Sequence, residues 1–218
     1  LGSVVVFALP RLLIPVESTP GETRVAATPD TVKKFISLGC SVAVECGAGT
    51  PSGYLDEAYA EQGADLIEKG DTSAWGQADV LLCVQSPSAA TLARLRQGAL
   101  VVGLLSPYAN EELTAALKRS GLSAMALELL PRISRAQSAD ALSSQANIAG
   151  YKSVLLASAA LDRYFPMLMT AAGTVQPAKV VILGAGVAGL QAVATARRLG
   201  AVVSVSYTHL RAHETLPY

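Results

Sequence analysis

Residues 179–190 read Lys-Val-Val-Ile-Leu-Gly-Ala-Gly-Val-Ala-Gly-Leu. The apolar run Lys179 to Leu183 predicts a short strand, and the amphipathic run Leu190 to Leu199, followed by Gly200, predicts a helix. Between them lies a G-x-G-x-x-G motif made of Gly184, Ala185, Gly186, Val187, Ala188 and Gly189. In this strand-to-helix context the motif predicts dinucleotide binding, whereas a glycine turn in an ordinary αβ connection is the alternative.

Each glycine of the motif has an expected structural role. Gly184 permits the tight turn, Gly186 lets the backbone approach a pyrophosphate, and Gly189 lets helix and strand pack closely. The N–H groups and the positive dipole end of the helix then face the phosphates. An acidic residue for the ribose hydroxyls is expected about 20 residues after the motif begins, near Ser204. The sequence has no Asp or Glu between Gly189 and Glu214.

The chain before the motif alternates apolar runs with amphipathic stretches. Continuous apolar runs predict strands that are covered on both faces. Thr28 and Pro29 predict a helix start, with a buried stripe before a stop at Gly39. The predicted strands are 11–16, 41–45, 64–67, 79–84, 99–104 and 123–127, and the predicted helices are 28–38, 56–62, 89–97, 111–118 and 146–161.

This rhythm predicts an α/β fold with two Rossmann-like, doubly wound parallel-sheet lobes, the second of them truncated. We place an N-terminal lobe at 9–135 and the incomplete start of a dinucleotide-binding lobe at 136–203. The polar segment Pro131 to Ser144 interrupts the rhythm, and Gly173 to Pro177 is predicted to be a turn-rich linker. Residues 1–8 are expected to precede the patterned protein.

Composition excludes several classes of function. Seventeen basic residues balance seventeen acidic ones, so the formal net charge is zero and nothing indicates a nucleic-acid partner. The three cysteines form no CxxC pair, which favours small buried thiols in a reducing compartment over a disulfide framework. The apolar start of the chain is interrupted by Pro10 and Arg11, so it predicts no membrane span.

The end of the chain has a different character. The run Val205 to Thr215 lacks a clean helix or strand period and contains both histidines. Its back-translation resembles a sequencing-library adapter, so we expect residues 204–218 to be a non-native tail and the gene to be cut before the ribose acid. The alternative is a genuine loop in which His209 and His213 bind metal at i, i+4 spacing, but no third ligand is suggested, and we predict no metal site.

Three segments resemble a known family. Gly21 to Pro29 (GETRVAATP) and Val44 to Gly49 (VECGAG) resemble sequences shared by alanine dehydrogenases and the alpha subunit of proton-translocating NAD(P) transhydrogenase. Pro131 to Ser144 (PRISRAQSADALSS) is similar to the transhydrogenase version specifically. The resemblance covers about Leu9 to Val203.

The resemblance implies a function and its residues. Arg132, Gln137 and Asp140 would be the catalytic loop residues around the nicotinamide end of NAD(H), and Ser143 would hydrogen-bond to the carboxamide. Arg132 and Asp140 can also pair with each other, and without the resemblance the segment is a polar linker whose ion pair stabilises by less than about 1 kcal/mol. Hydride would pass from NADH directly to NADP⁺, so NADP(H) would be bound by a partner component.

The same resemblance implies transmembrane and NADP(H)-binding partner components, a homodimer, and a cytoplasmic position at the inner or plasma membrane. Alanine dehydrogenase is the alternative enzyme, but its family has a Lys and a His where this sequence reads Val84-Gln85-Ser86-Pro87 and Leu104-Leu105-Ser106-Pro107-Tyr108. Oxidation of an amino acid needs such a base. The arginine that Arg24 resembles binds the substrate carboxylate in alanine dehydrogenases. In this chain we expect Arg24 to pair with a carboxylate of the protein and to have a structural role. As a third possibility, the 218-residue chain alone is a non-catalytic fragment with weak or no NAD binding.

Overall fold

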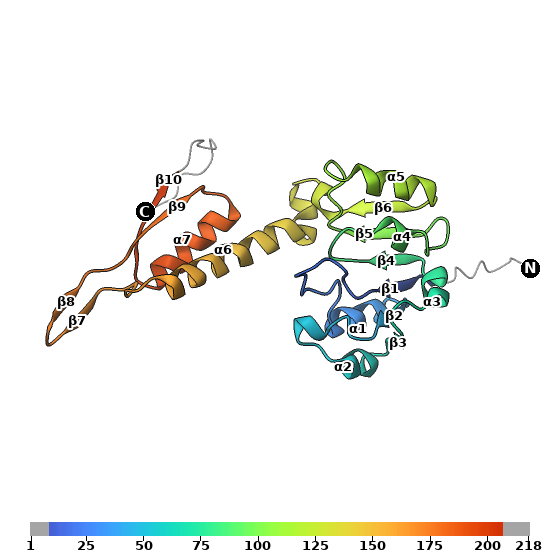
Figure 1. Ribbon diagram of the computed structural model, residues 1–218, viewed down its shortest axis with the longest axis horizontal. Coiled ribbons are helices and arrows are strands. Elements are labelled where there is room, and N and C mark those ends of the chain that lie inside the picture. Colours follow the sequence, from blue (N-terminus) through green and yellow to red (C-terminus); the bar gives the residue numbers. More distant parts are fainter. Residues whose placement is uncertain (1–8, 207–218) are drawn as a thin grey trace, which may run out of the picture. The chain divides into compact units, whose positions relative to one another are not determined.

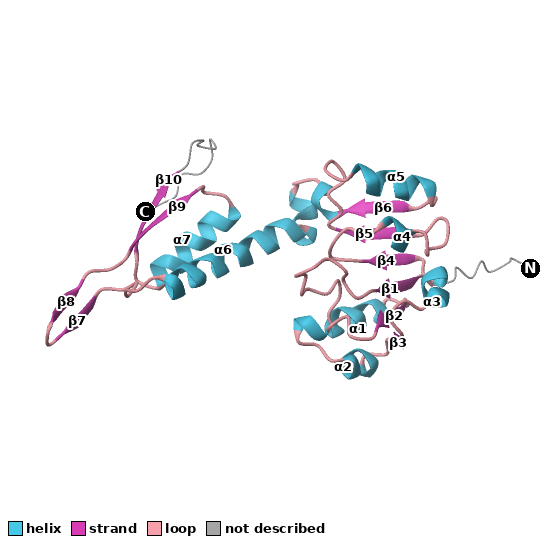
Figure 2. Ribbon diagram, viewed as in Figure 1, coloured by secondary structure: helices cyan, strands magenta, loops and turns pink. Residues whose placement is uncertain are grey.

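The computed structural model describes residues 9–206, which divide into two compact units between Ala139 and Asp140. The division lies a little after the boundary at residue 135 that the sequence suggested. Figures 1 and 2 show the elements of each unit, and no helix among the described residues is both long enough and apolar enough to cross a membrane.

The first unit is built on one six-stranded, wholly parallel sheet in the order β3-β2-β1-β4-β5-β6. All six strands that the apolar runs predicted are present, and the α/β class is confirmed. Their bounds are β1 Arg11–Ile14, β2 Ser41–Glu45, β3 Asp65–Ile67, β4 Val80–Leu82, β5 Leu100–Gly103 and β6 Ser123–Ala126.

Helices cover both faces of this sheet because the chain reverses its direction of winding between β3 and β4. Alternate residues of β1 show the two faces: Leu12 and Ile14 belong to one buried cluster, and Leu13 belongs to the other. The Leu12 cluster includes residues of α1 and α2, and the Leu13 cluster includes residues of α3, α4 and α5. The helices are α1 Pro29–Ser37, α2 Asp56–Glu61, α3 Thr72–Gln77, α4 Ala89–Leu92 and α5 Glu111–Arg119, with short 3-10 turns η1 Thr50–Ser52, η2 Leu127–Leu129 and η3 Ser134–Ala139.

Local signals explain most helix ends. Thr28 caps α1 by accepting from the Thr31 N–H, and Gly39 beyond its end has φ +91°, as the sequence predicted. The expected helix 89–97 is wrong beyond Leu92, because the chain turns there and Leu95 N bonds to Leu92 O. Helix α3 was not predicted; its signal is Asp71, whose carboxylate accepts from the N–H groups of Ser73 and Ala74.

The second unit contains α6 Ala141–Ala160, β9 Lys179–Leu183, α7 Val187–Arg198 and β10 Val202–Ser206. Parallel strands β9 and β10 form a two-stranded sheet, and α6 packs along α7. Helix α6 starts five residues before the expected Ala146, because Asp140 caps it. The predicted linker 173–177 is also corrected, because β7 Leu168–Thr170 and β8 Gly173–Val175 form an antiparallel hairpin there.

Strand β10 extends three residues into the segment 204–218 that the sequence predicted to be a non-native tail. Ser204, Val205 and Ser206 continue β10 and pair with Val181, Ile182 and Leu183 of β9. Their pairing with β9 is made by backbone groups, so the strand forms without a regular apolar period. Residues 207–218, including His209 and His213, lie outside the described residues, and the non-native origin of 204–218 stays a prediction.

Tyr59 gives a test of the packing beneath α2. Its side chain is fully buried, its hydroxyl donates to the Ala27 carbonyl at 2.9 Å, and burial raises the pKa of Tyr59 to about 12. Tyr59→Phe leaves that carbonyl without a donor and is expected to lower the free energy of unfolding by about 1–2 kcal/mol. Urea denaturation checks this, with Tyr108→Phe, at an 89 % exposed position, as the control. Equal losses in the two variants would show that the hydrogen bond contributes nothing.

Candidate functional site

The glycine motif forms a tight turn between β9 and α7. Gly184 has φ +103°, a conformation that favours glycine, and its N–H donates to Ser206 O at 2.8 Å. Gly186 is the N-cap of α7, and a Cβ on it would meet no atom within 4 Å. The backbone is therefore open to a ligand at the point where the first N–H groups of α7 lack helical acceptors.

Two glycines allow the backbone to pack closely behind this turn. A Cβ on Gly189 would lie 1.9 Å from Gly184 O, inside the turn itself. A Cβ on Gly150, in the middle of α6, would lie 2.1 Å from Ala188 O. Gly189 therefore has the packing role that the motif predicts, whereas sequence reasoning missed Gly150. The available signal was a glycine inside an otherwise Ala- and Leu-rich helix.

The polar loop divides between the two units. Arg132 and Gln137 belong to the first unit, and both are exposed, Gln137 within η3. Asp140 and Ser143 belong to the second unit and lie together at the start of α6. Asp140 accepts from the Ser143 N–H at 2.9 Å and from the Ser143 hydroxyl at 2.6 Å. The Ser143 hydroxyl thus donates to a carboxylate and keeps its lone pairs for a ligand donor.

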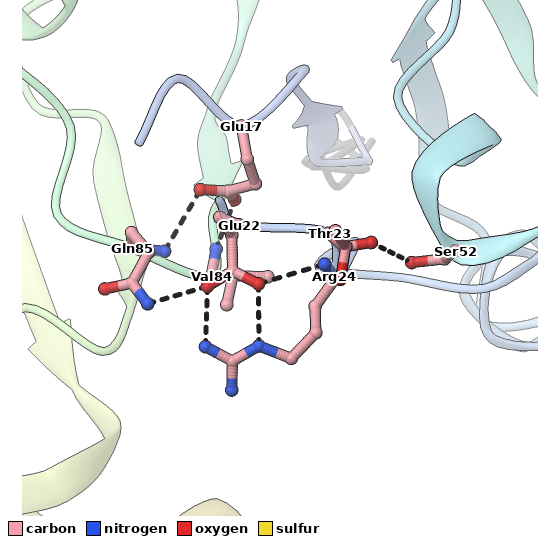
Figure 3. A network of polar contacts seen from close by, with 7 residues as sticks. All are labelled: Glu17, Glu22, Thr23, Arg24, Ser52, Val84 and Gln85. Atoms are coloured by element: carbon pink, nitrogen blue, oxygen red, sulfur yellow. Dashed lines mark hydrogen bonds and ion pairs between the residues drawn. The ribbon is translucent and has the colours of Figure 1, made fainter. Parts of the chain in front are cut away.

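A second polar network lies at the carboxyl end of β4 (Figure 3). Glu22 accepts from Arg24 Nε at 2.8 Å, from Arg24 Nη2 at 2.6 Å and from Gln85 Nε2 at 2.7 Å. Glu17 accepts from the backbone N–H groups of Val84 and Gln85. The loop after β1 is thereby bound to the end of β4, and Arg24 has the structural pairing that the sequence suggested.

This pairing shifts the pKa of both partners. Hydrogen bonding to Arg24 is the largest cause that lowers the pKa of Glu22, to about 2 from its usual 4.5, and the same bond raises the pKa of Arg24. Burial outweighs two backbone hydrogen bonds at Glu17 and raises the pKa of that carboxyl.

The expected ribose acid is not found on β10. The strand ends at Ser206, and the carboxylates of the second unit's described residues are Asp140 and Asp162, both before the glycine motif. The glycine turn is therefore formed, while a ribose-binding acid at the strand end is absent from the described residues.

Comparison with known proteins explains why these features occur together. Residues 13–149 match the family described as alanine dehydrogenase/PNT, N-terminal domain, and residues 153–218 match its C-terminal domain. The chain belongs to this family.

Named relatives come from both branches of the family. The chain is 48 % identical over 198 residues to an NAD(P) transhydrogenase subunit alpha of Rhodospirillum rubrum, covering 88 % of this chain and 51 % of the relative. It is 35 % identical over 202 residues to alanine dehydrogenase of Mycobacterium tuberculosis, covering 89 % and 53 %. The chain thus spans about half the length of these relatives.

A solved structure supports the same placement. The crystal structure of transhydrogenase from Sinorhizobium meliloti superposes with a TM-score of 0.85 at 51 % identity, over 89 % of this chain and 58 % of that one. The Rossmann-like fold and the resemblance to transhydrogenase alpha subunits are therefore confirmed.

The close packing at Gly150 and Gly189 can be tested by adding a methyl group at each position. Gly150→Ala and Gly189→Ala each place a methyl group against backbone and are expected to destabilise the second unit by about 1–3 kcal/mol. Gly76→Ala is the matched control, because Gly76 lies in helix α3, an added methyl would meet no atom within 4 Å, and the variant should gain about 0.5–1 kcal/mol. Urea unfolding measures all three variants, and a Gly150→Ala variant as stable as Gly76→Ala would contradict the close packing.

The Glu22–Arg24 pair predicts a particular acid sensitivity. Because the folded pKa of Glu22 is about 2 and its usual value is 4.5, the stability that the ionised group contributes is present above pH 4.5 and is lost as the pH falls towards 2. Glu22→Gln should remove this part of the pH dependence. Unfolding measured from pH 5 to pH 2 checks it, with Glu61→Gln on the surface of α2 as the control. If the stability of the wild type and of Glu22→Gln fell in parallel with pH, the Glu22–Arg24 pair would not be the source of the acid sensitivity.

Proposed function

We propose that this chain is the front part of the NAD(H)-binding component of a proton-translocating transhydrogenase. In this proposal a hydride passes directly between NADH bound here and NADP⁺ bound by a partner component. The observation that carries the proposal is the glycine turn from β9 into α7, in a chain whose transhydrogenase relatives are more similar to it than the named alanine dehydrogenase.

The glycine turn fits the pyrophosphate of a dinucleotide. Gly184, Ala185 and Gly186 form its open edge, and Val187, Ala188 and Gly189 form the first turn of α7. Free N–H groups and the helix dipole at this point favour a bound anion. NAD(H), when bound, supplies the hydride chemistry, and these residues orient it.

The side chains near the family's substrate positions favour hydride transfer over amino-acid oxidation. Gln85 stands where alanine dehydrogenases have a Lys, and its amide donates to Glu22. The segment 104–108, where alanine dehydrogenases have a His, contains no His. Both segments thus lack the Lys or His base that amino-acid oxidation needs, whereas direct hydride transfer needs only aligned rings and excluded water.

The polar loop supplies the alignment in this proposal. Gln137 contacts the nicotinamide-bearing half of NAD(H), and Arg132 fixes the loop and touches the ligand. Asp140 fixes the orientation of Ser143, whose hydroxyl already donates to it, and Ser143 accepts from the carboxamide. Arg132, Gln137 and Asp140 are thus proposed as the catalytic set, and Ser143 with residues 184–189 as the cofactor-binding set.

The proposal includes other components. The relatives named as alpha subunits imply further subunits, among which we place a transmembrane component and an NADP(H)-binding component. The protein would be cytoplasmic and peripheral on the inner or plasma membrane through these partners. We also propose a homodimer, supported by the exposed apolar side chains of Met169 in β7 and of Met167 just before it.

A chimera tests the function, because the chain spans half of its relatives. Residues 9–203 replace the matching segment of the Rhodospirillum rubrum relative, which is combined with the remaining components of that enzyme. Deuterium from the reactive position of NADH is expected to appear in NADPH without exchange with solvent. Gln137→Leu should slow this transfer about 10²-fold while the NADH Kd changes little, because alignment and not affinity is lost.

Ser138→Ala, at the neighbouring exposed position, is the control and should keep the parental rate. Alanine-dependent reduction of NAD⁺ by the chimera, or loss of NADH affinity equal to the loss of rate in Gln137→Leu, would contradict the proposal.

A further inference from the structure

The first unit has a cavity of its own at the carboxyl edge of its sheet. It measures about 180 Å³ and lies beyond the ends of β1 and β4, the neighbouring strands between which the strand order reverses. In open α/β sheets ligands bind at such a reversal. We call it the switch-point cavity; its charged lining residues are Glu17, Glu45, Lys69 and Arg94.

Arg94 lines this cavity and has no hydrogen-bond acceptor within residues 9–206. Its guanidinium carbon lies 4.3 Å from the centre of the Trp75 ring, so the cation is stacked on an aromatic face. Even Nη2, which is shielded from solvent, has no acceptor. A guanidinium has five N–H donors, and leaving a buried donor unpaired costs free energy.

The carboxylates that line the cavity already have donors. Glu45, which is 2 % exposed, accepts from Val16 N, from Gly70 N and from Trp75 Nε1, each at 2.9 Å. Glu17 accepts from the two backbone N–H groups at the end of β4. Among the described residues that line the cavity, Arg94 is therefore the one that still needs a hydrogen-bond acceptor.

We propose that the switch-point cavity binds a small oxyanion, a phosphate or a short-chain carboxylate, that accepts from Arg94 and pairs with Lys69. Lys69 lies on the exposed loop between β3 and α3 and lines the same cavity. The site lies within the first unit and does not depend on the function proposed for the glycine turn.

Size and charge agree with a ligand of this kind. The cavity is smaller than the roughly 300–1,000 Å³ of sites for drug-sized molecules, so its size suits a ligand of a few heavy atoms. An oxyanion would form charge-assisted hydrogen bonds with the guanidinium fork.

Trp75 provides the measurement, because it is the chain's single tryptophan and lies under the Arg94 guanidinium. The 218-residue chain is titrated with sodium phosphate and with sodium acetate at constant ionic strength, with sodium chloride as the reference salt. A saturable change in Trp75 fluorescence is expected with at least one of the two oxyanions and not with chloride. Saturation by phosphate alone identifies a phosphate site, and saturation by acetate alone identifies a carboxylate site.

Variants assign the signal to the cavity. Arg94→Gln should weaken the oxyanion at least about tenfold, and Lys69→Gln, on an exposed loop, should weaken it severalfold without affecting folding. Arg96→Gln is the matched control, because Arg96 pairs with Asp79 instead and should leave the affinity unchanged. Circular dichroism confirms that each variant is folded.

Three results would overturn the proposal. They are no saturable change with either oxyanion, equal affinity in wild type and Lys69→Gln, and a loss in Arg96→Gln as large as that in Lys69→Gln. The Lys69 and Arg96 comparison decides the question even if Arg94→Gln fails to fold.

Discussion

Parallel pairing is the constraint on which the arrangement of polar groups depends. Because β1 pairs in parallel with both β2 and β4, the carboxyl ends of all six strands meet at one edge of the first sheet. The last residue of β2, Glu45, and the loops after β1 and β4, with Glu17 and Gln85, therefore lie at one edge although they are far apart in sequence. The β9–α7 turn repeats the arrangement in the second unit, with glycine backbone in place of charged side chains.

Two acidic groups at the edge of the first sheet, Glu45 and Glu22, hold loops in place through several hydrogen bonds. Glu45 joins the end of β1, the loop before α3 and Trp75, while Glu22 is engaged by Arg24 and Gln85. Glu22 is a weak base, because its hydrogen bonds stabilise the charged form and lower its pKa to about 2. A site of this kind suits the binding and positioning of ligands, in agreement with direct hydride transfer as the proposed chemistry.

The sequence predicted what depends on short-range pattern. Continuous apolar runs indicated all six strands of the first sheet, and Thr28 and Gly184 indicated a cap and a turn that the structure confirms. Contacts between distant segments were not predictable. Glu45 looked like the polar end of a strand, because its partners Val16, Gly70 and Trp75 lie on other elements.

Two elements and one glycine show other reasons why the sequence pattern did not predict the structure. Helix 89–97 was predicted too long because Leu92 and Leu95 repeat at helical spacing, yet both are buried around a turn. The β7–β8 hairpin was missed because its strands are three residues long and exposed, without an alternating apolar signal. The role of Gly150 was missed because glycine is needed there by the nearby Ala188 carbonyl. Ala188 lies in α7, which follows much later in the sequence.

Helix α6 connects the two halves of the proposed cofactor site within the second unit. Asp140 and Ser143 form its first turn, and Gly150 lies ten residues after Asp140, about 15 Å along the axis, against the glycine turn. The fixed contact at Gly150 sets the register of α6 on α7, and the Asn147–Gln191 hydrogen bond at 3.2 Å supports it. A shift along this interface would therefore move Asp140 and Ser143 relative to residues 184–189. Gly150 thus affects the proposed site through geometry alone, without any contact of its own with a ligand.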